Sequence, residues 1–395
     1  MSNNLIFRCR KLCRGLKSYL ILEDGTVMEG CGFGSPGIRV GELVFTTGMV
    51  GYHEAITDPS FKGQILIFTH PMMGNYGVPS RGILEFGVPK YFESDRPQVE
   101  AVVVAYHNIP SHWASIKSLD EWLRDEGIPA VSDVDTRELV KRIREKGVMN
   151  ALVAVYEVGE EACVDELINK LNSSLRYDYR DLVSDVMPKN IVFHEPLNFS
   201  SNVPTIIVVD CGIKYGILRE LIKNGFRVIR IPCIEDPIKY YIEFNASGIL
   251  YSNGPGNPKL LHHTVKYARA VLEYGIPTLG ICLGHQVLAL AAGADVYKLK
   301  YGHRGHNKPC VDLERGKCFV TSQNHGYAVS SESLSNTGFK LWFINADDKT
   351  VEGLKHLSKP VVTVQFHPEG SPGPLDSEWI FNLFKRFVER YGTTF

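Results

Sequence analysis

Apolar residues follow two different patterns along the chain, and these predict two kinds of folded region. Between residues 18 and 60, short apolar runs such as SYLILEDGTV and GELVFTTGMV alternate with glycine-rich turns, which predicts antiparallel strands. QILIFTHP and VEAVVVAY predict further strands. Two predicted helices follow, SLDEWLRDEG and DVDTRELVKRIREKG, and the second has an Asp/Thr start and a glycine stop. The first half is therefore predicted to be an α+β region that ends near residue 185.

After residue 204 the pattern changes to buried strands that alternate with helices. PTIIVVD is a continuous β-branched run, KYGILRELIKNG is a helix closed by glycine, and FRVIRIP is the next strand. SGILYSNGPG, HHTVKYARAVLEYG and IPTLGIC continue the alternation as strand, helix and strand. This order predicts an α/β fold built on a mostly parallel sheet covered on both faces. Such sheets carry their functional sites in the loops beyond the carboxyl ends of the strands.

These patterns divide the 395 residues into four parts. Residues 1–17 carry five basic residues and no acidic one, which favours a disordered leader over a transit peptide. Residues 18–186 are predicted to form an N-terminal domain, residues 187–203 a linker with little periodicity, and residues 204–395 the α/β domain. Two or three domains of about 100–200 residues each fit this length.

Composition and charge exclude several classes of protein. The formal net charge is −1, without the basic surplus typical of nucleic-acid binders, and no uncharged apolar run reaches the roughly 18–20 residues of a membrane span. Nine cysteines are scattered without a C-x-x-C pair, which predicts neither a disulfide framework nor a zinc ribbon. We therefore expect a cytoplasmic protein that binds neither nucleic acid nor membrane.

The sharpest candidate for chemistry is Cys282 in the segment GICLGHQ (280–286), which follows a predicted strand and precedes a predicted helix. A nucleophile on a strand-to-helix turn flanked by glycines is the arrangement of a nucleophile elbow. The positive end of the following helix favours the thiolate, and the backbone N–H of Leu283 would point at an oxyanion formed on attack. Cys211, which also follows a strand, is the rival nucleophile, but it lacks a preceding glycine.

A cysteine nucleophile needs a general base, and the base needs a group that orients it. The predicted strand PVVTVQF runs directly into His367, at the edge of the sheet where Cys282 emerges, and Glu369 follows two residues later. Glu369 is placed to accept the second imidazole N–H and fix the tautomer. His285 lies on the helix after Cys282 and is not expected to face the substrate.

Neither a metal site nor a phosphate-binding loop is predicted. His303, His306 and His325 have no acidic or cysteine partner at metal-ligand spacing. The glycine-rich turn SNGPG (252–256) lacks the lysine of a phosphate-binding loop, so this chain is not expected to bind ATP. Its glycines instead allow the main chain to approach a small ligand and to offer N–H groups to a carbonyl or carboxylate.

Taken together and in this order, SNGPG, GICLGHQ, SQNHGYAV (322–329) and QFHPE (365–369) resemble the triad-type glutamine amidotransferases. The first half, with GELVFTTGMVGYHEAITDPSFKGQILIFTHPMMGNYGV and DVDTRELVKRIREKG, resembles the small-subunit family of carbamoyl-phosphate synthetases, as does DCGIKYGILREL. The resemblance covers about residues 19–390.

The resemblance implies a role for particular residues. Cys282 would be the nucleophile, and His367 and Glu369 would complete the triad. The residues that would hold L-glutamine are Ser60, Gly254, Gly256, Leu283, Gln286, Asn324, Gly326 and Tyr327. The family usually has phenylalanine at the position of Tyr327, so only a main-chain contact is inferred for that residue.

The resemblance also implies a reaction and a partner. L-Glutamine would be hydrolysed through a cysteine thioester, with no cofactor in this chain, and the ammonia would pass to a large synthetase subunit in a heterodimer or higher oligomer. That subunit would use ATP, Mg²⁺ and bicarbonate to make carbamoyl phosphate for arginine and pyrimidine biosynthesis. Two alternatives stay open: an amidotransferase with another acceptor, and a catalytically silent regulatory or scaffold subunit.

Overall fold

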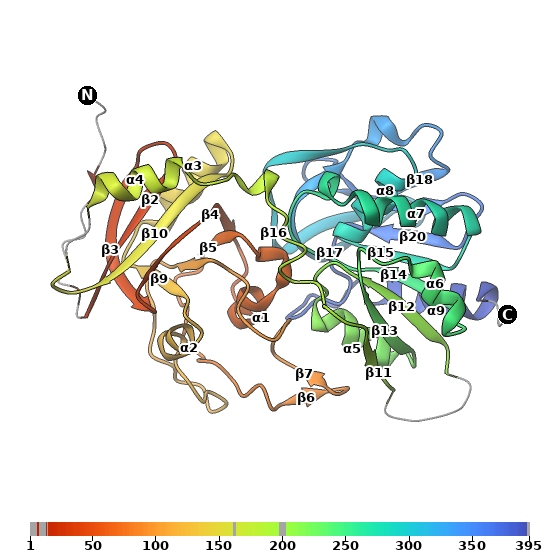
Figure 1. Cartoon of the computed structure of the whole chain (residues 1–395), viewed down its shortest axis with the longest axis horizontal. Helices are drawn as coiled ribbons and strands as arrows, with labels where there is room; N and C mark the ends of the chain where they lie inside the picture. Colours follow the sequence, from red (N-terminus) through yellow and green to blue (C-terminus); the bar gives the residue numbers. More distant parts are fainter. Residues whose placement is uncertain (1–5, 8–12, 14, 161–162, 197–202, 393–395) are drawn as a thin grey trace. The chain divides into compact units, whose positions relative to one another are not determined.

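A computed structural model describes residues 6–7, 13, 15–160, 163–196 and 203–392. The chain divides into two compact units, coloured along the sequence in Figure 1. The first unit comprises residues up to Ile83 together with Ser94–Arg180, and the second comprises Leu84–Glu93 and the chain from Asp181 onward. A ten-residue segment from the N-terminal half therefore belongs to the second unit.

The first unit is built on a mixed sheet in the order β1-β3-β2-β10-β4-β5-β8-β9, which an additional pairing between β3 and β9 closes on itself. The antiparallel pairing predicted for residues 18–60 is confirmed for β2 with β3, and β4 pairs antiparallel with β10. The other edge of β4 pairs in parallel with β5, and β5, β8 and β9 continue in parallel. The strands are β1 (Ile6–Phe7), β2 (Leu16–Leu22), β3 (Val27–Gly34), β4 (Gly37–Thr46), β5 (Gln64–Phe68), β8 (Ala101–Val103), β9 (Pro129–Ser132) and β10 (Met149–Glu157).

Short helices connect and cover this sheet: α1 (Tyr52–Thr57), η1 (Pro59–Phe61), α2 (Leu119–Asp125), α3 (Thr136–Lys146), α4 (Val164–Asn172) and η2 (Tyr177–Tyr179). The predicted start and stop of α3 are confirmed, because Asp135 accepts a hydrogen bond from the backbone N–H of Glu138 and Gly147 ends the helix at a φ of 95°. Helix α4 lies beside β2 and β10 (Figure 1). Its Leu167 and Leu171 belong to one buried cluster with Ile21 of β2 and Leu152 of β10.

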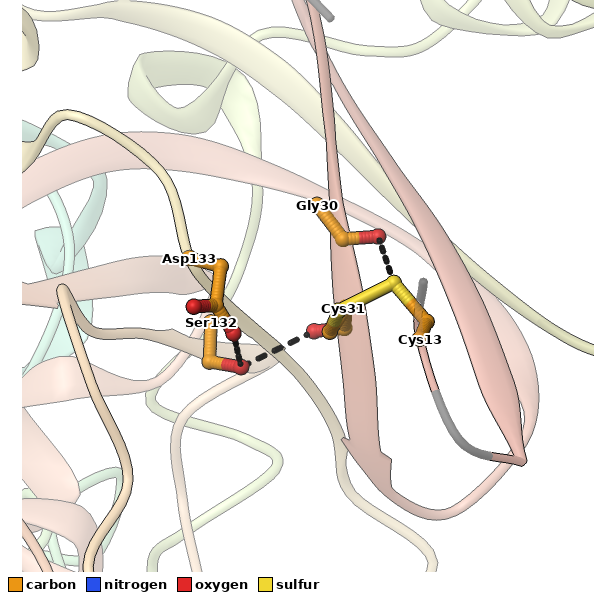
Figure 2. The surroundings of a disulfide bond; sticks show 5 residues. All are labelled: Cys13, Gly30, Cys31, Ser132 and Asp133. Atoms are coloured by element: carbon orange, nitrogen blue, oxygen red, sulfur yellow. Dashed lines mark hydrogen bonds between the residues drawn. A yellow bond between two sulfur atoms is a disulfide. The ribbon is translucent and has the colours of Figure 1, made fainter. Parts of the chain in front are cut away.

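The N-terminal residues differ in part from the predicted leader. Residues 1–5, 8–12 and 14 lie outside the described residues, and β2 begins at Leu16. Cys13 forms a disulfide with Cys31 of β3, where Ser132 of the neighbouring β9 donates a hydrogen bond to the Cys31 carbonyl (Figure 2). The spacing of the cysteines predicted no disulfide framework, and this one bond was missed because no short sequence motif marks the two residues, which the fold of the first unit brings together.

The second unit is built on a ten-stranded sheet in the order β11-β13-β12-β14-β15-β20-β19-β18-β16-β17. Its centre, from β13 to β20, is parallel, which confirms the predicted α/β fold. The strands are β11 (Val192–His194), β12 (Thr205–Asp210), β13 (Arg227–Pro232), β14 (Gly248–Tyr251), β15 (Thr278–Ile281), β16 (Val296–Asp312), β17 (Lys317–Val329), β18 (Phe339–Asn345), β19 (Val351–His356) and β20 (Val361–Val364), with a separate hairpin of β6 (Leu84–Glu85) and β7 (Val88–Pro89).

Helices lie against this sheet, and apolar side chains fill the space on both of its faces. Two residues show this: Ile207 of β12 belongs to one buried cluster, and its neighbour Ile206 belongs to the other. The helices are α5 (Tyr215–Lys223), α6 (Pro237–Glu243), η3 (Pro258–Leu260), α7 (His262–Tyr274), α8 (Leu283–Ala291), η4 (Ser331–Leu334) and α9 (Trp379–Tyr391).

Two features of the second unit were not predicted. The long antiparallel strands β16 and β17, together with β18 and β19, extend the parallel centre of the sheet. Within the stretch predicted to be a linker, Val192–His194 forms β11 and pairs antiparallel with β13, and residues 197–202 lie outside the described residues. Among the residues that the structure describes, no helix is long and apolar enough to cross a membrane.

Candidate active site

Cys282 occupies the turn between β15 and α8 in the second unit, as the elbow motif predicts. Its backbone has φ 54° and ψ −103°, a conformation that non-glycine residues rarely adopt. Its N–H donates to the carbonyl of Val364 in β20, and its thiol donates to the carbonyl of Asn324 in β17 at 3.6 Å. Strained conformations of this kind persist where the surrounding structure holds them, and they cluster at functional sites.

The glycines on either side of Cys282 are required by close packing rather than by backbone conformation, since neither has a positive φ. A Cβ on Gly284 would lie 2.1 Å from the carbonyl oxygen of Tyr251, and a Cβ on Gly280 would lie 2.6 Å from Leu288 Cδ1. The first turn of α8 is therefore pressed against the ends of β14 and β15. This contact fixes the position at which Cys282 emerges from the sheet.

His367 and Glu369 form a buried pair as predicted, with 2.7 Å between His367 Nδ1 and Glu369 Oε1. β20 ends at Val364, earlier than the apolar run indicated, and an isolated bridge to Ser322 of β17 holds His367 in place. Since the Glu369 carboxylate accepts from Nδ1, Nε2 is the nitrogen left to exchange a proton with a reacting group. Nε2 is buried, and Cys282 is the side chain that interacts with His367 on the side away from Glu369.

The surroundings of this pair favour its ionised form. Burial opposes protonation of His367, but the Glu369 carboxylate and the interaction with Cys282 outweigh it and raise the pKa of His367 to about 10. Burial also works against ionisation of Glu369, but Lys214 and His367 lower the pKa of its carboxyl to about 2. The site therefore holds an imidazolium beside Cys282, ready to give its proton to a leaving group.

Lys214 is a residue of this site that the sequence analysis did not single out. It immediately precedes α5, its side chain is buried, and its Nζ lies 3.0 Å from Glu369 Oε1 and donates to the carbonyl of Gly370. The side-chain oxygen of Asn253, in the SNGPG turn, accepts from the N–H of Lys214. The local sequence DCGIKYGILREL indicates only that this lysine lies near the start of a helix. Its partner Glu369 is distant in the sequence and is brought to it by the fold.

Replacing Lys214 by methionine is expected to move the acid limb of glutamine hydrolysis to higher pH. Glu369 is ionised down to low pH because Lys214 offsets its burial, and it contributes stability above its ordinary pKa that is lost as the pH falls toward about 2. Without the cation, burial raises this pKa. We expect the acid limb of the pH profile of kcat/KM to move to higher pH by about one unit or more. We also expect kcat to fall about 10- to 100-fold.

Lys223→Met is the matched control, because Lys223 lies on the neighbouring helix α5, pairs with Glu220 and Glu378, and is 45% exposed. Its pH profile should match that of the unmodified chain. An unchanged acid limb in folded Lys214→Met would contradict the role assigned to Lys214.

The glycine turn predicted to hold glutamine lies against the elbow. A Cβ on Gly254 would meet the carbonyl oxygen of Cys211 at 2.3 Å and Leu283 Cδ2 at 2.8 Å, so Gly254 packs directly on Leu283. Gly256 has a φ of 87°, which only glycine adopts readily. The structure thus brings Gly254 and Leu283 together beside Cys282, as the predicted oxyanion-binding groups require.

The predicted residues of β17 also lie at this edge of the sheet. Asn324 accepts from the Cys282 thiol through its carbonyl, and Gly326 follows two residues later. Gln286 of α8 is buried, and its amide nitrogen donates to the carbonyl of Tyr327 and to Gln365 Oε1, both at 3.0 Å. Gln286 therefore supports the main chain of Tyr327 in this structure.

Ser60, the remaining residue predicted to bind glutamine, belongs to the first unit. It lies in η1, is buried, and donates its backbone N–H to Asp58 Oδ1 at 2.9 Å. This Asp58 side chain caps the short helix and fixes the backbone at Ser60.

The rival residues do not have the character of catalytic groups. Cys211 is completely buried, and its hydrogen bond with Cys233, together with burial, raises the pKa of its thiol well above the ordinary value. His285 is buried on α8 with Nδ1 2.7 Å from Thr363 Oγ1, and burial lowers its pKa to about 3. Both side chains are buried in the interior of the second unit, and we assign them a structural role.

One cluster near the site has the composition of a metal site. His303, His325 and Glu352 are buried and present ligand atoms that lie within 4.8 Å of one another. No metal was predicted because the sequence showed no acidic partner for these histidines, and the fold supplies Glu352 from β19. The same contacts also form ion pairs, since His303 lies 2.8 Å from Asp348 and 3.5 Å from Glu352.

Two family models match the chain. The model described as carbamoyl-phosphate synthase small chain, CPSase domain, matches residues 20–153, and that described as glutamine amidotransferase class-I matches residues 207–387. The second match spans the SNGPG turn, Cys282, His367 and Glu369.

Curated relatives match along nearly the whole chain. A carbamoyl phosphate synthase small chain of Pyrococcus furiosus is 52% identical over 94% of this chain and 98% of its own length. A carbamoyl phosphate synthase small chain of Saccharolobus solfataricus is 48% identical over 94% of this chain and 98% of its own length. A carbamoyl phosphate synthase arginine-specific small chain of Aspergillus fumigatus is 42% identical over 94% of this chain and 79% of its own length.

Proposed function

The chain belongs to the family of carbamoyl-phosphate synthase small chains and is a glutamine-hydrolysing subunit of that type, and on this premise we propose that Cys282, His367 and Glu369 carry out the hydrolysis. The observation that carries the proposal is the cysteine held at a φ of 54° on the turn before α8, with a buried imidazolium–carboxylate pair beside it.

In the proposed mechanism, the Cys282 thiolate attacks the side-chain amide carbonyl of L-glutamine. Backbone N–H groups of Leu283 and of a glycine in the SNGPG turn stabilise the tetrahedral oxyanion. His367 gives its proton to the leaving ammonia, which leaves a γ-glutamyl thioester on Cys282. Water then loses a proton to His367, attacks the thioester and releases glutamate, which restores the starting thiolate and imidazolium.

The proposed ligand set for glutamine is that implied by the family pattern. Gly254 and Leu283 pack against each other beside the nucleophile, which supports their place at the reacting amide. Asn324, Gly326 and the main chain of Tyr327 lie along β17, and Gln286 donates to the Tyr327 carbonyl. Gly256 belongs to the same SNGPG turn as Gly254. Ser60 belongs to the proposed set through the family pattern alone.

A small chain implies a large-chain partner, and we propose that the ammonia passes to it directly. There it would react with bicarbonate and ATP, with Mg²⁺, to give carbamoyl phosphate for arginine and pyrimidine biosynthesis. No cofactor is proposed for this chain. We also propose the cytoplasm as its location, because Cys163, Cys211, Cys233, Cys282, Cys310 and Cys318 carry free thiols, although the Cys13–Cys31 bond is unusual there.

The first unit offers a surface suited to such a partner. The loop between β8 and α2 exposes four large apolar side chains, with Trp113 91% and Ile109 88% accessible, accompanied by Tyr106 and Ile116. Exposed aromatic residues of this kind are the usual anchors of protein interfaces. We propose that the large chain covers this loop.

Trp113→Glu is expected to weaken binding of the large chain at least about tenfold, because burying the new carboxylate against an apolar partner is unfavourable. Titration of the large chain, followed by fluorescence anisotropy, measures this. Tyr274→Glu is the control, since Tyr274 is an exposed aromatic residue at the end of α7 in the second unit. Equal affinities for the two variants would contradict the assignment of this loop.

The proposed function is tested by glutamate release from L-glutamine, measured on the purified chain alone and together with a large synthetase chain. We expect hydrolysis that rises when the large chain is added, because an uncoupled glutaminase would waste its substrate. A folded chain that releases no glutamate in either mixture would contradict the proposal and leave the scaffold interpretation.

A further inference from the structure

Glu93 is the second carboxylate at the triad, and it comes from the N-terminal half of the sequence. It is the last residue of the segment Leu84–Glu93, which belongs to the second unit, and it is completely buried. Arg219 of α5 donates to Glu93 Oε1 at 2.6 Å, and the backbone N–H of Gly216 donates to Oε2 at 2.9 Å. Lys214 Nζ lies 3.9 Å from Oε2.

These contacts fix the stretch of backbone that carries Lys214. The carbonyl of Glu93 accepts from the N–H of Tyr215, and its carboxylate accepts from the next N–H, that of Gly216. Position 216 favours glycine, because a Cβ there would lie 2.9 Å from Glu369 Cγ and 3.1 Å from Glu93 Oε2. Two carboxylates therefore approach the same turn at the start of α5, and Lys214 lies between them.

Two carboxylates and two basic side chains meet at this turn. The Gly216 N–H and the Arg219 guanidinium both donate to the Glu93 oxygens, so these contacts favour the ionised carboxylate even though burial raises its pKa. Glu93 and Glu369 then offset Lys214 and Arg219. Removal of the Glu93 charge would leave a cation unbalanced in a buried site, where charge interactions are poorly screened.

We propose that Glu93 is a positioning residue for glutamine hydrolysis: it anchors the start of α5 and neutralises Arg219 and Lys214, so that Lys214 holds Glu369, and through it His367, in the reactive arrangement. The inference rests on the proposed function of the triad. It assigns a role in the chemistry to a residue that precedes the amidotransferase half by more than a hundred positions.

The proposal has a pH signature that a purely structural role lacks. The charged or titratable groups around His367 are Glu369, Lys214, Cys282 and, on β17, His325. Those around Glu93 are Arg219, Lys214 and, on the other side of Gly216, Glu369, and Glu85 lies 3.8 Å from Arg219. Loss of the Glu93 charge makes the potential at His367 more positive, so the imidazolium should lose its proton at lower pH.

The experiment compares Glu93→Gln and Glu93→Asp with the unmodified chain, each bound to the large chain, across the pH range of glutamine hydrolysis. For Glu93→Gln we expect kcat to fall about tenfold or more, KM to change little, and the alkaline limb to move down by about half a pH unit or more. Glu93→Asp retains the charge and should restore the alkaline limb, even if the shorter side chain lowers kcat.

Glu85→Gln is the matched control, because it makes the same change on the same segment, near the same arginine, at a side chain that is 41% exposed. It should behave as the unmodified chain does. Thermal unfolding shows whether each variant is folded. The inference would be overturned if folded Glu93→Gln had the same alkaline limb as the unmodified chain. It would also be overturned if the alkaline limb of Glu93→Asp were shifted as far as that of Glu93→Gln.

Cys282→Ala separates failure of the inference from failure of the proposed function. If Cys282→Ala loses hydrolysis while Glu93→Gln keeps the profile of the unmodified chain, the inference about Glu93 is wrong and the triad stands. If Cys282→Ala retains hydrolysis, the proposed function itself fails, and the inference fails with it.

Discussion

Cys282→Ala is expected to abolish glutamine-dependent synthesis of carbamoyl phosphate by the complex with the large chain, while synthesis from added ammonia continues. The thiol forms the covalent intermediate, and loss of a triad nucleophile typically costs about 10⁴-fold or more in rate. The substitution removes one atom at the end of β15, where the backbone is held by Val364, so the fold should survive. Coupled assays with glutamine and with ammonium chloride measure the two activities.

Cys211→Ala is the control, because Cys211 also directly follows a parallel strand of the sheet and is also buried. Its raised pKa makes it a poor nucleophile, so its removal should leave glutamine-dependent synthesis close to normal. Loss of activity in Cys211→Ala with full activity in Cys282→Ala would reverse the assignment of the nucleophile.

His367→Asn is expected to lower kcat for glutamine hydrolysis about 10³-fold or more. Asparagine retains a hydrogen-bond donor toward Glu369 but cannot give a proton to the leaving ammonia or take one from the attacking water. Because Glu369 keeps its ion pair with Lys214, the buried carboxylate stays compensated. Steady-state glutamate release with the large chain present measures the loss.

His356→Asn is the control for that variant, since His356 lies on β19 of the same sheet and makes its hydrogen bonds to the backbone of the loop that follows. Its kcat should stay within a few-fold of normal. If His367→Asn kept a kcat similar to that of the control, the proton transfers would have to be assigned to another group.

Parts of the site were predictable from the sequence because each depends on residues within a short segment of the chain. Cys282 sits on the predicted turn, and His367 and Glu369 pair across one proline at the expected edge of the sheet. The βαβ order fixes that edge, since the carboxyl ends of parallel strands lie together. The predicted helix ends at Asp135 and Gly147 were likewise set by local capping.

The parts that the sequence did not reveal depend on contacts between distant segments. Glu93 meets Gly216 across 123 positions, and Lys214 meets Glu369 across 155, so no local pattern marks them. Glu352 reaches His303 only because β19 joins the same sheet as the long antiparallel strand β16. Cys13 and Cys31 are joined in the first unit without any cysteine motif.

A γ-glutamyl thioester on Cys282 can be trapped during turnover. The complex is mixed with L-glutamine, quenched in acid during turnover and digested, and the peptides are identified by mass spectrometry. We expect a γ-glutamyl adduct on the peptide that contains Cys282, formed fast enough to explain the rate of glutamate release and absent from Cys282→Ala. An adduct on another residue, or glutamate release at the normal rate by Cys282→Ala, would contradict this role of Cys282.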